Sequence, residues 1–262
     1  MARGAVKVLT WNVAGRTRET RERQAAEVVA QDADVVCLQE VTPTTRAAWA
    51  SDLAAAGYEV AVAAFPVKPA GSRRLAALIA ARAGLRAHGS LTELPWPERH
   101  LAAVTGDGLE VHTLHAPLSG KPGRVKARTL EALYAALCRD DETPRVLTGD
   151  LNTPQYESRE GEIHSFARTR SGRIREDYGE EHDRAELRLI ADLPARGWRD
   201  AFRHLHGYER RDRSWKGWGP GYRLDHILVS PELDVLACDY LHAWREDGLS
   251  DHSGMWAEVR RA

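Results

Sequence analysis

The stretch Val146-Leu147-Thr148-Gly149-Asp150-Leu151-Asn152 decides how we interpret the fold. It opens with a short apolar run, which is typical of a strand buried in a sheet. Asp150 and Asn152 follow this run directly and place polar side chains just beyond it. Loops at the strand ends of a rigid scaffold are where functional sites are built. The stretch therefore predicts a buried strand that leads into a functional site.

The same arrangement recurs along the chain on both sides of this stretch. Apolar strand-like runs at 5–11, 34–39, 109–115, 224–230 and 254–259 each carry polar residues within them or beside one end. Polar side chains that repeat at strand ends can converge on one rim of a sheet. We expect one site to be built from these residues, which are Asn12, Glu40, His115, Asp150, Asn152, Asp225, Asp251 and His252.

The intervening segments predict a layered α/β protein. Further strands are predicted at 58–64, 75–81, 101–105, 145–148 and 235–241, and helices at 17–32, around Trp49 and Leu53, along 125–137 and around Leu187 and Ile190. Thr42 followed by Pro43 predicts the N-cap and first turn of the second helix. Residues 153–182 carry many charges without a clear period and are predicted to form a long loop. With no repeat and no low-complexity linker, we expect one domain over residues 1–262.

Composition excludes several classes of protein. Hydrophobic residues make up 43% and charged residues 29%, which is ordinary for a soluble globular protein. The formal net charge is -1, so any basic binding face must be local. Cys37, Cys138 and Cys238 are widely separated and form no CxxC pair, which predicts free thiols rather than a disulfide or a zinc site. Without the apolar segment of a signal peptide or a run long enough to span a bilayer, the chain is expected in the cytoplasm.

The types of residue in the predicted site favour one kind of chemistry. Carboxylates combined with asparagine and histidine, without cysteine, favour a hard ion with oxygen ligands, such as Mg²⁺ or Mn²⁺, over zinc. Such an ion polarises a phosphoryl oxygen and stabilises the leaving oxyanion. A carboxylate can then orient or deprotonate the attacking water, and a histidine can stabilise the negative charge that develops.

Five motifs carry a resemblance to a known family. In chain order they are Thr10-Trp11-Asn12-Val13-Ala14-Gly15, Leu38-Gln39-Glu40-Val41, Gly149-Asp150-Leu151-Asn152-Thr153-Pro154, Arg223-Leu224-Asp225-His226-Ile227 and Ser250-Asp251-His252. This ordered series resembles that of the endonuclease/exonuclease/phosphatase superfamily, and it extends from Asn12 to His252. The resemblance implies a four-layer α/β/β/α sandwich with two packed mixed β-sheets and a site at their top edge. It also implies that Glu40 binds the catalytic metal, with Asn12 nearby and Asp251 contributing to a metal site.

The resemblance also implies the division of roles among the other residues. Asp150 is expected to position or deprotonate the water, and Asn152 to hold the phosphate. His252, oriented by Asp225, is expected to stabilise the transition state or to act as the base. His115 resembles a histidine of deoxyribonuclease I and of many phosphatases in the group. A protonated His115 is expected to bind a phosphate oxygen or to protonate the leaving group. Exonuclease III and apurinic endonucleases have a tyrosine there, which argues against a direct transfer of apurinic-endonuclease activity.

Taken singly, some of these residues have structural explanations. Asn12 is an ordinary turn former at a strand end, and Glu40 is equally well explained as part of a helix cap. Asp225 lies inside an apolar strand and is expected to have a partner, because an unpaired buried carboxylate is costly. His226 is interpreted as a satisfied buried histidine and His112 as a structural residue.

Two stretches bear on the substrate. Residues 66–86 carry basic residues and no acid, and residues 199–223 combine an excess of basic residues with aromatic ones. Such a mixture can follow a phosphate backbone and stack on bases. The alternative is a solvated basic loop whose tryptophans pack locally, and the sequence favours neither. The predicted substrate-binding residues are Arg213, Trp215, Lys216, Trp218 and Tyr222.

The sequence therefore predicts a metal-dependent phosphodiesterase that hydrolyses nucleic acid by in-line attack of water on phosphorus. DNA is the favoured substrate, and a repair nuclease is the kind of enzyme that fits. One alternative is a phosphatase or phosphodiesterase of a small phosphoester such as a nucleotide, an inositol phosphate or a phospholipid head group. Another is a catalytically silent binding module on the same scaffold, although the full set of candidate residues argues against it.

Overall fold

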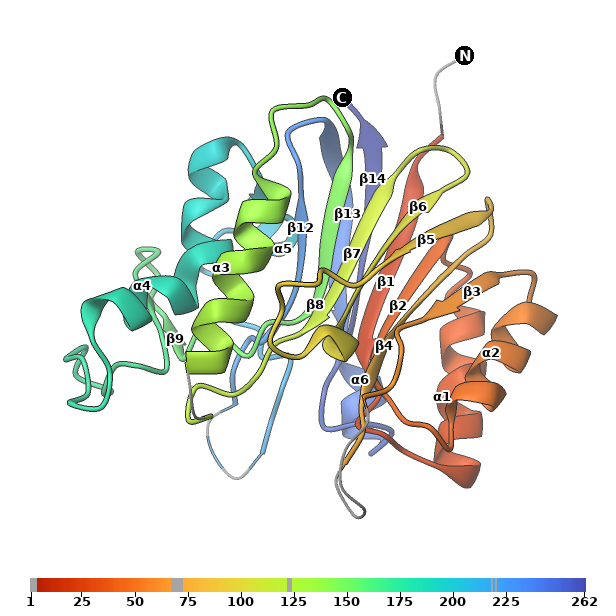
Figure 1. Cartoon of the computed structure of the whole chain (residues 1–262), viewed down its shortest axis with the longest axis horizontal. Helices are drawn as coiled ribbons and strands as arrows, with labels where there is room; N and C mark the ends of the chain where they lie inside the picture. Colours follow the sequence, from red (N-terminus) through yellow and green to blue (C-terminus); the bar gives the residue numbers. More distant parts are fainter. Residues whose placement is uncertain (1–3, 67–72, 122–123, 218, 220) are drawn as a thin grey trace.

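Two six-stranded β-sheets pack face to face, with helices on both outer faces (Figure 1). The computed structural model describes residues 4–66, 73–121, 124–217, 219 and 221–262. Both sheets are mixed, and the four layers confirm the predicted α/β/β/α sandwich.

The first sheet has the strand order β13-β14-β1-β2-β4-β3. Its strands are β1 (Val6–Asn12), β2 (Val35–Val41), β3 (Glu59–Val62), β4 (Ala76–Ala81), β13 (Leu233–Leu241) and β14 (Gly254–Arg261). Strands β1 and β2 run parallel, and the other neighbours run antiparallel. The helices on this side are α1 (Arg18–Ala30), α2 (Arg46–Ala55) and the short α6 (His242–Glu246).

The second sheet has the strand order β11-β12-β8-β7-β6-β5. Its strands are β5 (Leu85–Gly89), β6 (His100–Thr105), β7 (Glu110–His115), β8 (Arg145–Asp150), β11 (Arg199–Asp200) and β12 (Asp225–Val229). The helical elements on its outer side are α3 (Val125–Leu137), α4 (Glu180–Leu187), a π-helical turn at Arg188–Asp192 and the 3₁₀ turn Pro194–Arg196. Helix α5 (Ala201–His206) packs against both β12 and β13, and the 3₁₀ turn Pro97–Arg99 packs against both β4 and β6. The small hairpin of β9 (Tyr156–Glu157) and β10 (Ile163–His164) stands apart from both sheets.

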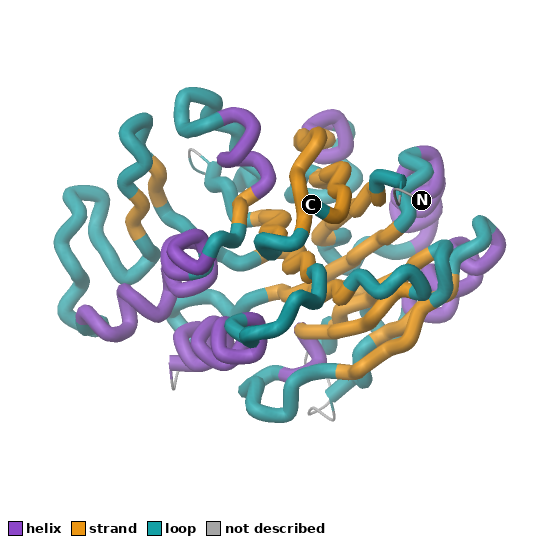
Figure 2. Tube along the Cα trace, turned by 90° about the horizontal axis from the view of Figure 1, so that it is seen from above, coloured by secondary structure: helices purple, strands orange, loops and turns teal. Residues whose placement is uncertain are grey.

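The period of two along each strand divides the apolar residues between layers. In β1, Val8 belongs to the core between the sheets, whereas Leu9 and Trp11 pack toward the helices. In β8, Val146 faces the other sheet and Leu147 packs toward α3. Figure 2 shows the consequence from above, with the strands in the middle and helices toward the outside. This alternation decides which polar residue at a strand end faces the space between the sheets.

The structure differs from the sequence prediction mainly in short elements. The predicted N-cap at Thr42 is wrong, because α2 begins at Arg46 after Thr45. The Thr42 carbonyl accepts hydrogen bonds from the backbone N–H groups of Thr45 and Arg46, so a turn precedes the helix. Strand β5, helices α5 and α6, and the two-residue strands β9 to β11 were not predicted. Elements of this length bury too few residues for a clear period.

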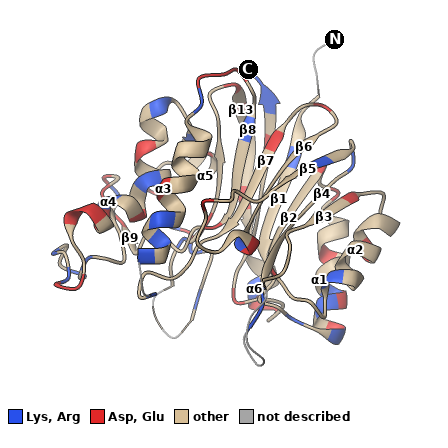
Figure 3. Cartoon of the chain, in the orientation of Figure 1, with Lys and Arg blue, Asp and Glu red and all other residues tan. Residues whose placement is uncertain are grey.

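Charged residues are distributed without one dominant sign. In Figure 3, Lys and Arg are interspersed with Asp and Glu over the helices and loops, while the strands are mostly uncharged. Among the described residues, no helix is both long and apolar enough to cross a membrane.

Candidate active site

Strand pairing brings three of the predicted residues into one row. His115 lies opposite Asp150 in the parallel pair β7–β8, and Asp150 lies opposite Asp225 in the antiparallel pair β8–β12. All three are buried. Gly149 allows the strands to approach at this point, because a Cβ atom there would lie 2.1 Å from the carbonyl oxygen of Leu114. The second sheet thus presents a row of titratable side chains at one end.

The first sheet supplies the other half of the site. Asn12 ends β1, and His252 lies just before β14. Trp11 Nε1 donates a hydrogen bond to the His252 carbonyl at 3.0 Å, and Ser250 Oγ donates to the Asn12 carbonyl at 2.7 Å. Glu40 has a left-handed backbone (φ 62°) where the β2–β4 register is irregular. The irregular register interrupts the alternation of side chains along β2 at Glu40, and the carboxylate of Glu40 contacts Asn12 and His115 in the site. We call Glu40, His115, Asp150, Asp225 and His252 the catalytic cluster.

The side chain of Asn12 joins the carboxylates of the two sheets. Its Nδ2 lies 3.1 Å from Asp150 Oδ2 and 3.4 Å from Glu40 Oε1. Its Oδ1 accepts a hydrogen bond from the backbone N–H of Ala14 at 3.0 Å, which fixes the orientation of the amide. In this arrangement Asn12 orients the two carboxylates through its NH₂ group and does not present its oxygen to a metal.

His252 and Asp225 form a tightly bonded pair beside Asp150. His252 Nδ1 lies 2.8 Å from Asp225 Oδ2, and His252 Nε2 lies 3.7 Å from Asp150 Oδ2. Burial alone would lower the pKa of His252, but the charges of Asp225 and Asp150 outweigh burial and raise this pKa to about 10. The imidazole is therefore protonated at neutral pH and can donate from Nε2.

Asp150 is perturbed in a way that suits acid–base chemistry. Burial and the nearby charge of Asp225 raise its pKa to about 7, while the charge of His252 and hydrogen bonds from Asn152 and Asn12 oppose the shift. A carboxyl group with this pKa exchanges protons near neutral pH, where a general base is most effective.

His115 lies against the same carboxylates from the other side. Its Nε2 is 3.6 Å from Glu40 Oε1 and 3.8 Å from Asp150 Oδ2. Burial and the positive charges of Arg99, His252 and Arg73 hold its pKa well below the usual range. The protonated form expected from the sequence is therefore disfavoured in this arrangement.

The loop after β8 holds Asn152 in a fixed position. Asn152 has a φ of 50°, and its Nδ2 donates to the Ala116 carbonyl at 2.7 Å. Its own carbonyl accepts a hydrogen bond from Lys126 Nζ at 2.6 Å. Lys126 is buried and pairs with the buried Glu186 of α4 at 3.1 Å. An internal ion pair between α3 and α4 thus supports the loop after β8, and no sequence pattern predicts this pair.

A cavity of about 560 Å³ opens over the catalytic cluster. One side of the cavity includes Trp215 and Tyr222, whose rings stack with centroids 5.8 Å apart, and Phe166, which meets Tyr222 edge-on. Trp215 Nε1 donates to Asp251 Oδ2 at 3.0 Å, which places this exposed carboxylate at the rim. Sequence reasoning did not identify several lining residues, namely Leu75, Trp96, Arg99, Leu118, Lys121 and Phe166.

The predicted substrate-binding residues are separated by the structure. Trp215 and Tyr222 line the catalytic cavity, whereas Arg213 lines a neighbouring cavity of about 250 Å³. Lys216 is exposed, and its backbone N–H donates to the carbonyl of Asp251. Trp218 lies outside the described residues.

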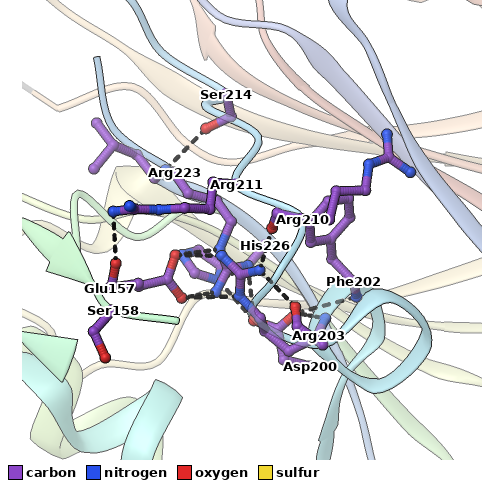
Figure 4. Close-up of polar contacts among 12 residues, drawn as sticks. Glu157, Ser158, Asp200, Phe202, Arg203, Arg210, Arg211, Ser214, Arg223 and His226 are labelled. Carbon is purple, nitrogen blue, oxygen red and sulfur yellow. Dashed lines mark hydrogen bonds and ion pairs between the residues drawn. The ribbon is translucent and has the colours of Figure 1, made fainter. Parts of the chain in front are cut away.

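Much of the basic stretch at 199–223 is paired inside the protein. Arg223 contacts Glu157 at 2.8 Å and Asp200 at 2.9 Å, Arg203 contacts Glu157 at 2.7 Å, and His226 lies 3.1 Å from Asp200 (Figure 4). We call these five residues the Arg223 network. An arginine held between buried carboxylates is not available to a substrate. The number of arginines in residues 199–223 therefore overstates the basic surface that this stretch exposes.

The donors in the site fit a hard cation. The carboxylates of Glu40 and Asp251 line the cavity, and oxygen donors of this kind suit Mg²⁺ or Mn²⁺. Asp150, Asp225 and His252 also place ligand atoms within 4.8 Å of one another. Among the described residues, Asp225 Oδ1 is buried without a hydrogen-bond partner, so this cluster has coordination or hydrogen-bonding capacity left.

Comparisons with known proteins agree with this geometry. The model of the endonuclease/exonuclease/phosphatase family matches residues 9–252. An AP endonuclease from Archaeoglobus fulgidus is 21% identical with a TM-score of 0.73, covering 96% of this chain and 98% of that one. The Neisseria 3′ phosphatase NExo, bound to a product DNA hairpin, is 22% identical with a TM-score of 0.71, covering 97% and 98%. TDP2 from D. rerio, complexed with a single-strand DNA product, is 17% identical with a TM-score of 0.66, covering 98% and 100%. No curated protein matches the sequence.

Proposed function

The chain belongs to the endonuclease/exonuclease/phosphatase family, and from this premise we propose that it is a metal-dependent phosphodiesterase acting on DNA. The observation that carries the proposal is the placement of Asp150, with a pKa of about 7, beside the protonated His252 in one cavity. A proton acceptor and a fixed positive charge at this separation fit attack of water on a phosphoryl group.

Each residue of the cluster has a part in this proposal. Asp150 accepts a proton from the attacking water and directs the water oxygen at phosphorus. His252 donates a hydrogen bond to the phosphate oxygen that gains negative charge. Asp225 holds His252 in the required tautomer, as the 2.8 Å contact indicates. Asn152 has one amide hydrogen beyond its bond to Ala116 and donates it to a phosphate oxygen.

We assign the metal to Glu40 and Asp251, whose carboxylates both line the cavity. Glu40 and Asp251 would hold Mg²⁺ or Mn²⁺, and the bound ion would supply positive charge to polarise a phosphoryl oxygen. Asn12 keeps the carboxylates of Glu40 and Asp150 in place through its NH₂ group. DNA is favoured as substrate because two structural neighbours are described with DNA bound, and a repair nuclease would fit the same neighbours.

The proposal is tested by hydrolysis of duplex, single-stranded and abasic-site DNA with Mg²⁺, with Mn²⁺ and with chelator. The Asp150→Asn protein serves as the blank, because it removes the proton acceptor and keeps the shape of the side chain. Chelator-sensitive cleavage that depends on Asp150 is the expected result. If no DNA form is cleaved with either metal, the nuclease proposal is wrong.

A small phosphoester is the second candidate substrate. One feature favours it: His115 resembles the histidine of many phosphatases in the family, and it lines the cavity. Adding nucleotides and inositol phosphates to the same assay distinguishes the candidates. Release of phosphate from these compounds, with DNA untouched, would select the phosphatase.

A further inference from the structure

The side chain of Arg73 lies against Glu40, one of the two carboxylates to which the metal is assigned. Arg73 comes just before β4 and lines the catalytic cavity. Its Nη2 lies 2.6 Å from Glu40 Oε2, and the same nitrogen donates a hydrogen bond to the carbonyl oxygen of Ala14 at 2.9 Å. Glu40 Oε1 lies 3.4 Å from Asn12 Nδ2 and 3.6 Å from His115 Nε2. Both oxygens of Glu40 are therefore in contact with neighbours, and Arg73 holds one of them.

The backbone beside Glu40 is shaped to receive this guanidinium. Ala14, Gly15 and Glu40 have left-handed backbone conformations, with φ values of 53°, 59° and 62°. A Cβ atom on Gly15 would lie 2.9 Å from Arg73 Nη2, so a larger residue there would crowd the guanidinium. The turn also presents the Ala14 carbonyl oxygen beside the carboxylate of Glu40. One guanidinium therefore reaches both acceptors.

Arg73 differs from the arginine of the Arg223 network in how firmly it is held. The side chain of Arg73 is 60% exposed, whereas that of Arg223 is 3% exposed. Arg223 contacts two carboxylates, Glu157 and Asp200. In the part of the chain that the structure describes, Glu40 is the one carboxylate that pairs with Arg73. Water solvates an exposed guanidinium when it leaves its partner, so Arg73 can be displaced from Glu40.

The positive charge of Arg73 opposes other positive charges in the cavity. Burial is the largest cause that lowers the pKa values of Arg99 and His115, and the charge of Arg73 adds to it at both residues. Mg²⁺ and Mn²⁺ take carboxylate oxygens as ligands, and like charges repel at close range. Binding of a divalent cation at Glu40 is therefore opposed by the guanidinium that already holds Oε2 of this carboxylate.

We propose that Arg73 competes with the metal ion for Glu40 and thereby sets the metal concentration at which the site becomes active. At low metal concentration the guanidinium stays on the carboxylate. As the metal concentration rises, Arg73 gives up Glu40 and turns toward solvent. The inference rests on the proposed function for the assignment of the metal to Glu40, and it concerns the regulation of metal binding rather than the chemical step.

The test measures the affinity of the protein for Mn²⁺ without substrate, by electron paramagnetic resonance. Arg73→Gln is expected to bind Mn²⁺ about 10-fold more tightly than the unmodified protein, because no charge-assisted hydrogen bond at Glu40 then has to be broken. Arg73→Lys keeps the charge and is expected to lie between the two. Adding Glu40→Gln to Arg73→Gln should remove the gain, which assigns the gain to this carboxylate.

A second variant separates contact from the general charge of the cavity. Lys121→Gln is the matched control, because Lys121 lines the same cavity and no described contact joins it to Glu40. This substitution also removes one positive charge, but the affinity for Mn²⁺ should stay nearly unchanged. Thermal melting in chelator confirms that each variant is folded.

The outcomes separate this inference from the proposed function. Tighter Mn²⁺ binding in Arg73→Gln, with Lys121→Gln unchanged, supports the inference even if the protein hydrolyses no phosphoester and the proposed function fails. Equal or weaker binding in Arg73→Gln, or an equal gain in Lys121→Gln, would overturn the inference and leave the function intact. If neither the unmodified protein nor Arg73→Gln binds Mn²⁺, the inference is overturned together with the metal assignment.

Discussion

The catalytic cluster and the Arg223 network are two buried groups of charges that share the strand β12. Adjacent residues of this strand supply one member to each: Asp225 to the catalytic cluster and His226 to the network. Because side chains alternate along a strand, the two groups lie on opposite faces of the second sheet. Asp225 and His226 are both fully buried, so burial does not distinguish the two groups.

The two groups differ in how their charges are balanced. In the network, the charges and hydrogen bonds of Arg223 and Arg203 outweigh burial and lower the pKa of Glu157 to about 2. In the catalytic cluster, burial and the charge of Asp225 raise the pKa of Asp150 to about 7. Opposite shifts in similarly buried carboxylates indicate that the network stabilises the fold and that the cluster keeps a group able to react. The direction of the pKa shift, rather than burial, separates the proposed general base Asp150 from the paired carboxylate of Glu157.

Removing the carboxylate of Asp150 should have the largest effect. Asp150→Asn is expected to lower kcat by on the order of 10²–10⁴-fold, the usual contribution of a general base. The free energy of unfolding should not fall, because the substitution removes a buried carboxylate whose charged form burial disfavours. Steady-state kinetics and urea unfolding check both expectations. Glu157→Gln is the control from the network and should keep kcat; a lower kcat in both variants would erase the distinction between the groups.

Breaking the network should affect stability instead. Arg223→Met leaves the carboxylates of Glu157 and Asp200 without their shared cation and is expected to cost about 3–5 kcal/mol of unfolding free energy. The kcat of the folded fraction should be retained. Arg82→Met, which breaks an exposed pair with Asp32, is the control and should cost less than about 1 kcal/mol. Equal losses in the two variants would contradict the role given to the network.

As the pH falls, the contributions of Asp150 and Glu157 to the free energy of unfolding should change in opposite directions. The folded pKa of Asp150, about 7, lies above its ordinary value of 3.8, so its contribution to stability should rise as the pH falls from 7 to 4, by about 1.4 kcal/mol per unit. The folded pKa of Glu157, about 2, lies below its ordinary 4.5, so its stabilisation is complete above pH 4.5 and is lost as the pH falls through 2. Urea unfolding measured from pH 7 to pH 2 in the presence of a chelator measures both contributions.

Two variants assign the pH effects to their residues. Asp150→Asn should abolish the rise between pH 7 and 4, and Glu157→Gln should reduce the loss below pH 4.5. A profile that neither variant changes would mean that other groups control the acid response.

The smallest effect is expected at the support of the loop after β8. Replacing Lys126 by Met together with Glu186 by Leu removes both buried charges, so neither is left alone. The Asn152 carbonyl then loses its 2.6 Å contact, and kcat should fall roughly 10-fold, because small displacements of positioning groups slow catalysis. Lys7→Met is the control, since Lys7 Nζ also donates to a carbonyl, that of Gln31, far from the site. An unchanged kcat in the double variant would limit Lys126 to a structural role.

The sequence predicted the parts of the site that follow from strand periodicity. His115, Asp150 and Asp225 stand where apolar runs meet polar residues, and strand pairing placed them in one row. The prediction that Asp225 has a buried partner also agrees with its bond to His252. The four-layer fold followed from the same runs combined with the resemblance to the family.

What the sequence left out depends on contacts between distant segments. Arg99 precedes a strand rather than following one, and only the antiparallel β6–β7 register brings it to His115. Lys126 lies on a helix with apolar spacing, so its ion pair with Glu186, 60 positions away, has no local signal. Arg223 was counted as part of a basic surface because its partner Glu157 belongs to a distant hairpin. Charge pairing of this kind is decided by tertiary structure.

The bond from Trp11 to the His252 carbonyl has a consequence for synthesis of the protein. A chain that emerges from the ribosome presents β1 early, but His252 and the neighbouring strand β14 follow only after the second sheet has been made. The nascent chain therefore lacks a complete site while most of its residues are already exposed to the cell. Under the proposed function, the order of translation delays hydrolysis until the sandwich has closed, so a partly made chain should not attack phosphoesters around it.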